Sequence, residues 1–207
     1  MASHIAEAPR RIPTQERGER RVAQLLEAAA AVIAQTGYEA ATMSAIAERA
    51  HAPIGSLYQF FPNKRAIAHV LRTEYVEHYE GLLITLEKDA KNLSLERLVE
   101  RLVNVNVEFV ENRPAFLPLL DAPPSTKSPA ALRERLRERL ARCFTAAIPG
   151  VDKTRALGCA RIALQMLKGL NQLYGEVSAP EKRQIVCEFR IVLRSYLGAR
   201  LSSGKAR

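Results

Sequence analysis

The sequence has no long hydrophobic run. No segment joins about 18 uncharged apolar residues, so no helix is expected to span a membrane. The N-terminal stretch MASHIAEAPRRIP carries charges without an apolar core after them, which does not fit a secretory signal. We therefore expect a cytoplasmic protein with no membrane partner.

Cysteine and histidine are also scarce. Three cysteines lie far apart without a CxxC spacing, at Cys143, Cys159 and Cys187, and we expect reduced, buried thiols, with a redox switch as the alternative. None of the four histidines lies in HExxH or beside paired cysteines, so no metal site is expected. GxSxG, phosphate-loop and dinucleotide motifs are absent as well. We expect no cofactor and no enzymatic activity, the alternative being an all-helical enzyme with scattered carboxylates.

Convincing alternation of apolar and polar residues, the mark of a strand, is missing, and the fold class is expected to be all-α. Pro, Gly and capping residues such as Thr42, Asn63 and Ser94 divide the chain into about nine helices. The expected helices cover about 17–35, 42–50, 54–60, 63–89, 94–112, a short turn near 114–118, 129–147, 152–175 and 180–202. Gly37 is expected to end the first helix in a left-handed conformation. Residues 1–15 are expected to form a disordered basic arm, residues 16–64 a compact head, and residues 65–207 a helical body.

Lys and Arg outnumber Asp and Glu, 31 to 22, which gives a net charge of +9 and a pI near 9.8. Such a charge favours a polyanionic partner, nucleic acid first and a membrane surface second. A nonspecific nucleoid or membrane-surface protein would expose mainly cationic helix faces. The segment from Pro53 to Phe61 is uncharged, which favours sequence readout instead.

Two short helices joined by a tight turn, with a supporting helix before them, are typical of a helix-turn-helix unit at about residues 42–61. The spacing directs Ile46, Ala47, Leu57 and Phe61 inward. The residues left wholly or partly outward are Ile54, Gly55, Ser56, Tyr58 and Gln59. A helix in the major groove need not be cationic, because base edges are read by hydrogen bonds and apolar contacts.

The segment YEAATMSAIAERAHAPIGSLYQFFPNKRAI, from Tyr38 to Ile67, resembles the TetR/AcrR family of helix-turn-helix transcriptional regulators. The shared pattern is Gly-Tyr, then Thr-x-x-x-Ile-Ala, then Gly-Ser/Thr-Leu-Tyr-x-x-Phe-x-x-Lys. It covers residues 18–70 closely, and the remainder matches only in layout. The resemblance implies a homodimer that binds a palindromic operator in double-stranded DNA and is released by a small-molecule effector. A repressor is expected, with an activator as the alternative.

The resemblance also implies individual roles. The implied DNA-binding residues are Thr42, Ser44, Ile54, Gly55, Ser56, Tyr58, Gln59 and Lys64. Tyr58 and Lys64 would contact phosphates and Gln59 would read adenine; the alternatives are a cap alone for Thr42 and a rim-packed ring for Tyr58. Two departures from the pattern are Pro53, which removes a side-chain cap, and His51, which occupies a turn where Gly is common.

Basic residues before and within the first helix provide a further candidate contact with DNA. They are Arg10, Arg11, Arg17, Arg20 and Arg21. A disordered arm in the minor groove and a solvated tail are both compatible with this composition.

The body is expected to dimerise and to hold the effector. Broad apolar faces on the last two helices predict a four-helix contact between two copies, with burial inside one subunit as the alternative. The expected interface residues are Leu164, Leu167, Tyr174, Phe189, Val192, Leu193 and Tyr196. Polar residues on apolar faces, with apolar walls, predict a pocket for a lipophilic effector, and satisfied core polar groups are the alternative. The expected pocket residues are His78, Asn106, Phe109, Phe116, Leu120, Met166 and Asn171.

Overall fold

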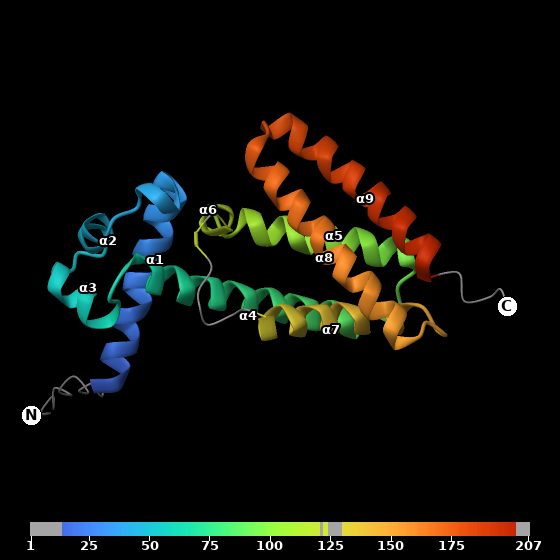
Figure 1. Cartoon of the computed structure of the whole chain (residues 1–207), viewed down its shortest axis with the longest axis horizontal. Helices are drawn as coiled ribbons and strands as arrows, with labels where there is room; N and C mark the ends of the chain where they lie inside the picture. The colour runs from blue at the N-terminus through green and yellow to red at the C-terminus, as the bar shows by residue number, and fades with distance from the viewer. Residues whose placement is uncertain (1–13, 121, 124–129, 202–207) are drawn as a thin grey trace, which may run out of the picture.

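The computed structural model describes residues 14–120, 122–123 and 130–201, and within these ranges it contains nine helices and no strand (Figure 1). The expected all-α fold is confirmed. The helices are α1 (Thr14–Ala40), α2 (Met43–Arg49), α3 (Ile54–Phe60), α4 (Lys64–Ala90), α5 (Leu95–Glu111), α6 (Phe116–Leu120), α7 (Ala130–Ala147), α8 (Lys153–Glu176) and α9 (Ala179–Leu201). Most of the expected basic arm, residues 1–13, lies outside the described residues, as do residues 121, 124–129 and 202–207.

Local signals explain most of the helix ends. Thr42, Asn63 and Ser94 each accept a hydrogen bond from a backbone N–H three residues on, at 3.1, 3.0 and 3.3 Å, as the sequence predicted. Pro53 starts α3 without a side-chain cap, which is also the expected consequence of a proline there. Gly37, with φ of 79°, interrupts the regular geometry of α1 close to the predicted end.

The head is built from α1, α2, α3 and the start of α4. Its core includes Leu25, Ile33, Ile46, Leu57 and Ile67, all fully buried. Within α1 the buried residues Leu25, Ala29, Val32 and Ile33 recur at three- and four-residue spacing, so this helix turns one apolar stripe inward.

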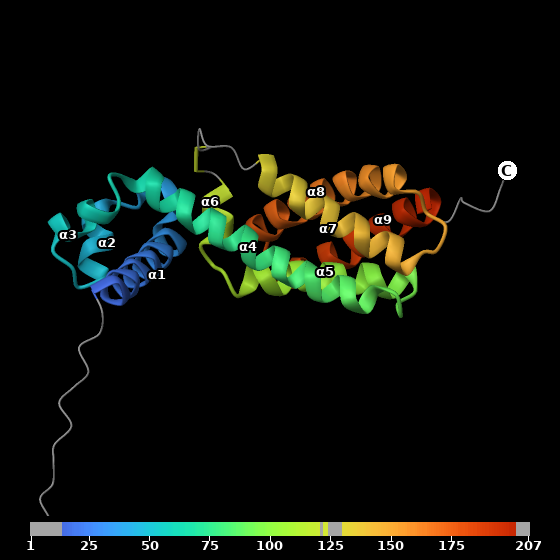
Figure 2. The ribbon, with the colours of Figure 1, turned by 90° about the horizontal axis from the view of Figure 1, so that it is seen from below.

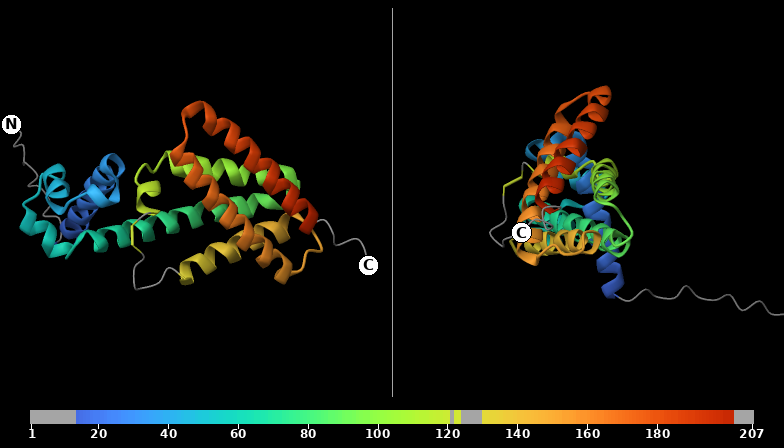
Figure 3. Two further views of the ribbon diagram at one scale, coloured as in Figure 1. Left: turned by 45° about the horizontal axis from the view of Figure 1, so that its top comes forward. Right: turned by 90° about the vertical axis from the view of Figure 1, so that its right-hand side faces the viewer.

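The long helix α4 leaves the head and runs along the body (Figures 1 and 2). In the body α7 packs along α4, and α8 and α9 pack on each other, while α5 contacts both α8 and α9 (Figure 3). Ion pairs fix α7 to α4. Glu87 lies 3.0 Å from Arg139 and 3.2 Å from Arg142, and the buried carboxylate of Glu80 is bonded by Arg135.

The short helix α6 packs on both parts of the molecule. Ala115, just before it, and Leu119 lie in the head core, whereas Phe116 packs against the body core. The head core therefore reaches beyond residue 64, the expected end of the head, to α6 and to the first turns of α4.

Arg72 on α4 holds the C-terminal end of α6. Its guanidinium donates to the carbonyl oxygens of Leu119, at 2.6 and 2.9 Å, and of Pro123, at 2.9 Å, and it also bonds that of Ala122. The last carbonyls of a helix have no partner within the helix, so these bonds satisfy groups that α6 leaves open. Burial lowers the pKa of Arg72 from its ordinary value.

The expectation of three buried thiols is corrected at one position. Cys143 and Cys159 are buried, but Cys187 is exposed, because its neighbour Val186 takes the inward-facing position on α9. Burial raises the pKa of Cys143 to about 12, which keeps this thiol protonated and unreactive.

His51 has φ of 47°, the left-handed region that favours glycine. A β-branched residue is strained there, so His51→Val is expected to lower the free energy of unfolding by about 1–2 kcal/mol. His51→Asn and His51→Gly are expected to be at least as stable as the wild type, because both residues tolerate this conformation. Urea denaturation of the three variants measures the difference, and equal stability of Val and Asn at this position would contradict it.

Candidate DNA-binding surface and ligand cavity

The outward face of α2 and α3 carries most of the residues predicted to bind DNA. Tyr58 is 51% exposed and Ile54 is 42% exposed, although both are large apolar or aromatic side chains. Thr42, Ser44, Gly55 and Gln59 are also exposed, and Ser56 is half-buried. Large exposed apolar groups on a protruding element are typical of an interaction surface.

Lys64 serves the fold of the head. Its ammonium donates to the carbonyl oxygens of Tyr38, at 2.6 Å, and Glu39, at 2.8 Å, and lies 4.5 Å from the centre of the Tyr38 ring. It thereby ties the start of α4 to the end of α1. Two of its three N–H donors are used in this way, so the phosphate contact predicted for Lys64 would have to rely on the third and on the amides that open α4.

The net positive charge does not lie on the head. Residues 14–71 contain six Lys and Arg against five Glu, whereas residues 130–201 contain fourteen Lys and Arg against six Asp and Glu. The uncharged face of α3 is therefore presented by a nearly neutral head. The cationic surface of the chain belongs mainly to α7, α8 and α9.

A cavity of about 130 Å³ lies in the body between α4, α5, α6, α7 and α8. Its walls are aliphatic and aromatic apart from two amides and one lysine. The lining residues are Tyr75, Val76, Tyr79, Asn106, Phe109, Phe116, Leu120, Leu136, Leu164, Leu167, Lys168 and Asn171. Five of the seven predicted pocket residues line this cavity: Asn106, Phe109, Phe116, Leu120 and Asn171.

The two buried amides in the cavity wall pair with each other. Asn106 Nδ2 donates to Asn171 Oδ1 at 2.6 Å, and Asn171 Nδ2 donates back at 3.5 Å. The hydroxyl of Tyr79 donates to Asn106 Oδ1 at 3.4 Å. The amides are thus hydrogen-bonded core groups, as one alternative held, and they also line the cavity; a ligand contact by them stays a prediction.

Three aromatic rings form the wall beside these amides. Phe109 meets Phe116 edge to face at 5.0 Å between ring centres, and Tyr79 at 5.1 Å. Tyr75 and Tyr79 were not predicted as pocket residues. The sequence did contain a signal for them. Two tyrosines lie one turn apart in α4, and a buried tyrosine needs a partner for its hydroxyl, so a polar group was to be expected beside them.

Two predicted pocket residues are corrected. Met166 packs on the body core but does not line the cavity, since at about 100° per residue it lies about 160° around α8 from both Leu164 and Lys168. His78 is turned about 100° away from Tyr79 and lines an open cleft between head and body instead. Burial and the nearby charge of Arg113 lower the pKa of His78.

This cleft lies between α1 of the head, α4, and the turn before α6. Tyr75 lines both the cleft and the cavity, so its side chain forms part of the wall between them. The guanidinium carbon of Arg113 lies 5.8 Å from the Tyr75 ring centre and 5.6 Å from that of Phe109. The body cavity and the head are therefore neighbours across one aromatic wall.

The predicted dimer residues lie mostly inside the subunit. Leu167, Tyr174 and Leu193 are buried in the body core, and the Tyr174 hydroxyl bonds Glu111. Leu164, Phe189 and Tyr196 are half-buried against the same core, and only Val192 is exposed. The apolar side chains that α8 and α9 do expose are Ile162, Leu173, Ile191 and Val192.

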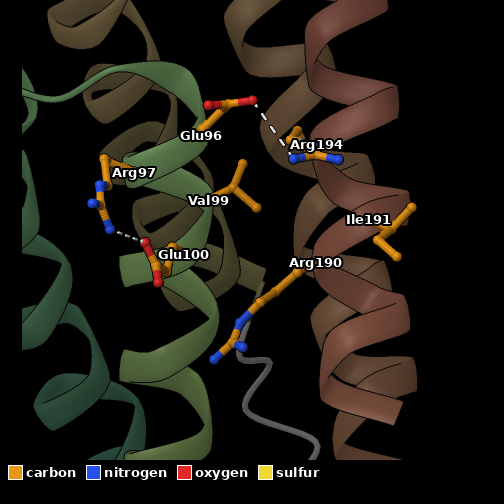
Figure 4. Close-up of a pocket in the computed structure, with 7 residues that line it drawn as sticks. All are labelled: Glu96, Arg97, Val99, Glu100, Arg190, Ile191 and Arg194. Atoms are coloured by element: carbon orange, nitrogen blue, oxygen red, sulfur yellow. Dashed lines mark hydrogen bonds and ion pairs between the residues drawn. The ribbon is translucent and has the colours of Figure 1, made fainter. Parts of the chain in front are cut away.

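A surface groove between α5 and α9 is filled by paired charges (Figure 4). Arg194 lies 3.6 Å from Glu96, Arg97 lies 2.7 Å from Glu100, and Arg190 donates to Asn104 Oδ1 at 2.6 Å. Apart from the buried Nε of Arg190, which has no partner among the described residues, these polar groups bond one another, and the largely apolar body cavity is the better candidate site.

Among the described residues, no cluster of three or more His, Cys, Asp or Glu side chains is placed to hold a metal ion. In the same part of the chain, none of the helices has the length and apolar character needed to cross a membrane.

Comparison with protein families identifies both parts of the chain. The family described as "Bacterial regulatory proteins, tetR family" matches residues 25–71, and "Tetracyclin repressor-like, C-terminal domain" matches residues 94–197. Together these matches cover the head and most of the body. The chain belongs to the TetR family of bacterial regulatory proteins.

Individual relatives agree with this assignment. The chain is 40% identical over 59 residues to the HTH-type transcriptional repressor KstR of Rhodococcus jostii, a match that spans 28% of this chain and 26% of that repressor. A TetR-family regulator from Streptomyces coelicolor is similar in structure, with a TM-score of 0.65, 27% identity, and coverage of 87% of this chain and 99% of that chain. SmeT, solved as a complex with triclosan, shares the fold with a TM-score of 0.62 at 18% identity, over 89% and 93% of the two chains.

A Cβ added to Gly55 would meet no atom within 4 Å, so nothing inside the protein requires glycine there. Gly55→Ala is therefore expected to raise the free energy of unfolding by about 0.5–1 kcal/mol, because alanine favours the helix. If the backbone of α3 approaches DNA closely at this point, the same change lowers operator affinity by roughly tenfold or more, the cost of about one lost base contact.

Gly81→Ala is the matched control, since Gly81 lies in α4, far along the chain from the head, and is equally open. It is expected to gain similar stability and to keep full DNA affinity. Denaturation and fluorescence anisotropy with a selected operator measure the two effects. Unchanged DNA affinity of Gly55→Ala would remove Gly55 from the contact surface.

Proposed function

We propose that this regulator is a repressor that binds a palindromic operator as a homodimer and leaves it when a small molecule enters the body cavity. The observation that carries the proposal is the uncharged, exposed face of α3 on a compact head, connected through α6 to a cavity with an almost wholly apolar wall. KstR, matched over 59 residues, is a repressor, which favours repression over activation.

The exposed face of α3 supports base readout. Gln59 can donate to and accept from an adenine, Ile54 can pack on a thymine methyl group, and Tyr58 can reach a phosphate. The head itself is nearly neutral, so specific contacts carry more of its affinity than charge does. Arg10 and Arg11, which lie outside the described residues, are further candidate contacts with DNA.

Dimerisation is supported by the apolar side chains that α8 and α9 leave exposed. Ile162 and Leu173 lie eleven residues apart, about three turns of α8, and so they face the same direction. With Val192 of α9 they provide an apolar surface that a second copy can cover. Two heads held at a fixed separation would read two half-sites one or more turns of DNA apart.

Release from DNA follows from the position of α6. Phe116 and Leu120 face the cavity, and Leu119 on the same helix is buried in the head core. A ligand that needs more room than the cavity provides pushes α6, and Arg72 transmits this movement to α4. Because α4 begins at the head, a small tilt changes the separation of the two heads and weakens binding to a palindrome.

Selection from random duplex DNA at moderate salt tests the DNA-binding part of the proposal. The wild type is expected to enrich a palindrome. Gln59→Ala is expected to lose about 1–3 kcal/mol at particular base pairs and so to relax specificity there. Tyr58→Phe, which removes only the hydroxyl, is expected to weaken binding evenly across sequences.

Phe60→Ala is a control for these variants, since Phe60 is also exposed on α3 but is not assigned to a DNA contact. Binding that is uniform across sequences and disappears with added salt would show that the head only grips phosphates, and the proposed function would then fail.

The connection through Arg72 can be tested without knowing the effector. Arg72→Met keeps an apolar stem but leaves the carbonyls of Leu119, Ala122 and Pro123 without their donor. We expect the free energy of unfolding to fall by about 2–3 kcal/mol, and amide exchange in residues 115–120 to accelerate. Hydrogen exchange measured by mass spectrometry checks the second effect.

Arg65→Met serves as the control, because Arg65 is exposed on the first turn of the same helix. It is expected to leave exchange in residues 115–120 unchanged. Equal exchange in both variants would mean that packing alone, and not Arg72, holds α6 in place.

A further inference from the structure

Lys168 is the one charged residue among those that line the body cavity. It is exposed although it lines the cavity, and so is Leu120 of α6, which is 42% exposed. A side chain that lines a cavity and still reaches solvent lies at its mouth. The mouth is therefore formed between α6 and α8, with an ammonium group on one side.

Within the described part of the chain, Lys168 makes no ion pair or hydrogen bond to another residue. The positions one turn away on α8 are Leu164, Gln165, Asn171 and Gln172, none of which is acidic. By contrast, Arg135, Arg139 and Arg142 of the neighbouring α7 are bound by Glu80 and Glu87. Lys168 is thus a cation without an internal counter-charge.

Lys168 supplies the charge at the mouth itself. The nearest other charges on α8 are Arg161 and Glu176, seven and eight residues away, or about 10 and 12 Å along the helix. Charges of one sign beside a low-dielectric cavity raise the local concentration of oppositely charged ligands. The electrostatics at this site therefore favour an anion and disfavour a cation.

The interior of the cavity determines the size and the polarity of the part of the ligand that enters it. At about 130 Å³ the cavity is close to the volume of roughly 150 Å³ that holds one benzene ring in an engineered protein cavity. The rings of Tyr79, Phe109 and Phe116 form its wall. The side-chain nitrogen of Asn171, three residues from Lys168 on the same face of α8, uses one of its two N–H groups, in a 3.5 Å bond to Asn106.

We propose that the effector is a small organic anion whose ring-sized apolar body fills the cavity and whose carboxylate pairs with the ammonium of Lys168. The spare N–H of Asn171 then donates to an oxygen of the same ligand. This inference rests on the proposed function for its biological meaning, but the binding itself is independent of DNA.

The test compares two probes of the same shape, 3-phenylpropanoate and its neutral amide, by calorimetry on the full chain without DNA. The wild type is expected to bind the acid roughly tenfold more tightly than the amide, the gain of one charge-assisted hydrogen bond. Lys168→Gln, which keeps most of the stem, is expected to bind both probes equally.

Two control variants locate the effect. Lys153→Gln removes the same charge from the other end of α8, about 22 Å away along the helix, and is expected to behave as the wild type does. Leu120→Trp adds bulk at the exposed mouth, where folding tolerates it, and is expected to weaken both probes.

Three results would overturn the proposal: no preference for the acid in the wild type, a preference that survives in Lys168→Gln, or acid binding unaffected by Leu120→Trp. Absence of binding by both probes would also overturn it. The proposed function is tested separately by the operator selection. If the protein selects a palindrome but binds neither probe, the proposed function stands and only the proposed anionic effector is withdrawn.

Discussion

The hydrogen bonds from Arg72 to the end of α6 anchor the short helix that lies between head and body to the long helix that connects them. A helix of five residues is too short to be stable alone, and its last carbonyls lack partners within the helix. Arg72 of α4 supplies those partners and so holds the end of α6 against α4. Because Leu119 packs in the head and Phe116 lines the cavity, these hydrogen bonds lie where the two parts of the molecule meet.

The surplus of positive charge and the residues proposed to read DNA bases lie in different parts of the molecule, the first in the body and the second in the head. The overall positive charge indicated a polyanionic partner, and the family assignment agrees with DNA, yet the surplus of Lys and Arg lies on α7, α8 and α9 rather than on the head. The head presents Ile54, Tyr58 and Gln59 instead, which suits readout of bases. Part of the positive charge of the body lies at the mouth of the cavity, where Lys168 makes no ion pair within the described residues.

Most of the fold could be predicted because its signals are local. Thr42, Asn63 and Ser94 cap helices within three residues of their own positions, and a proline or glycine lies near nearly every break. The helix-turn-helix unit was likewise readable from the spacing between Thr42 and Phe61. The exposure of Ile54 and Tyr58 on α3 follows from helix geometry once Leu57 and Phe61 are directed inward.

The sequence by itself determined the helices, the helix-turn-helix unit and the family, since each depends on residues close together in the chain. Only the tertiary structure decided which of several apolar faces is buried. Periodicity gives the angle between Leu167 and Leu173 on α8, but it does not say that the first packs in the core while the second remains exposed. It also could not bring together Tyr79, Asn106 and Asn171, because a cavity between five helices is defined by packing between segments far apart in the sequence.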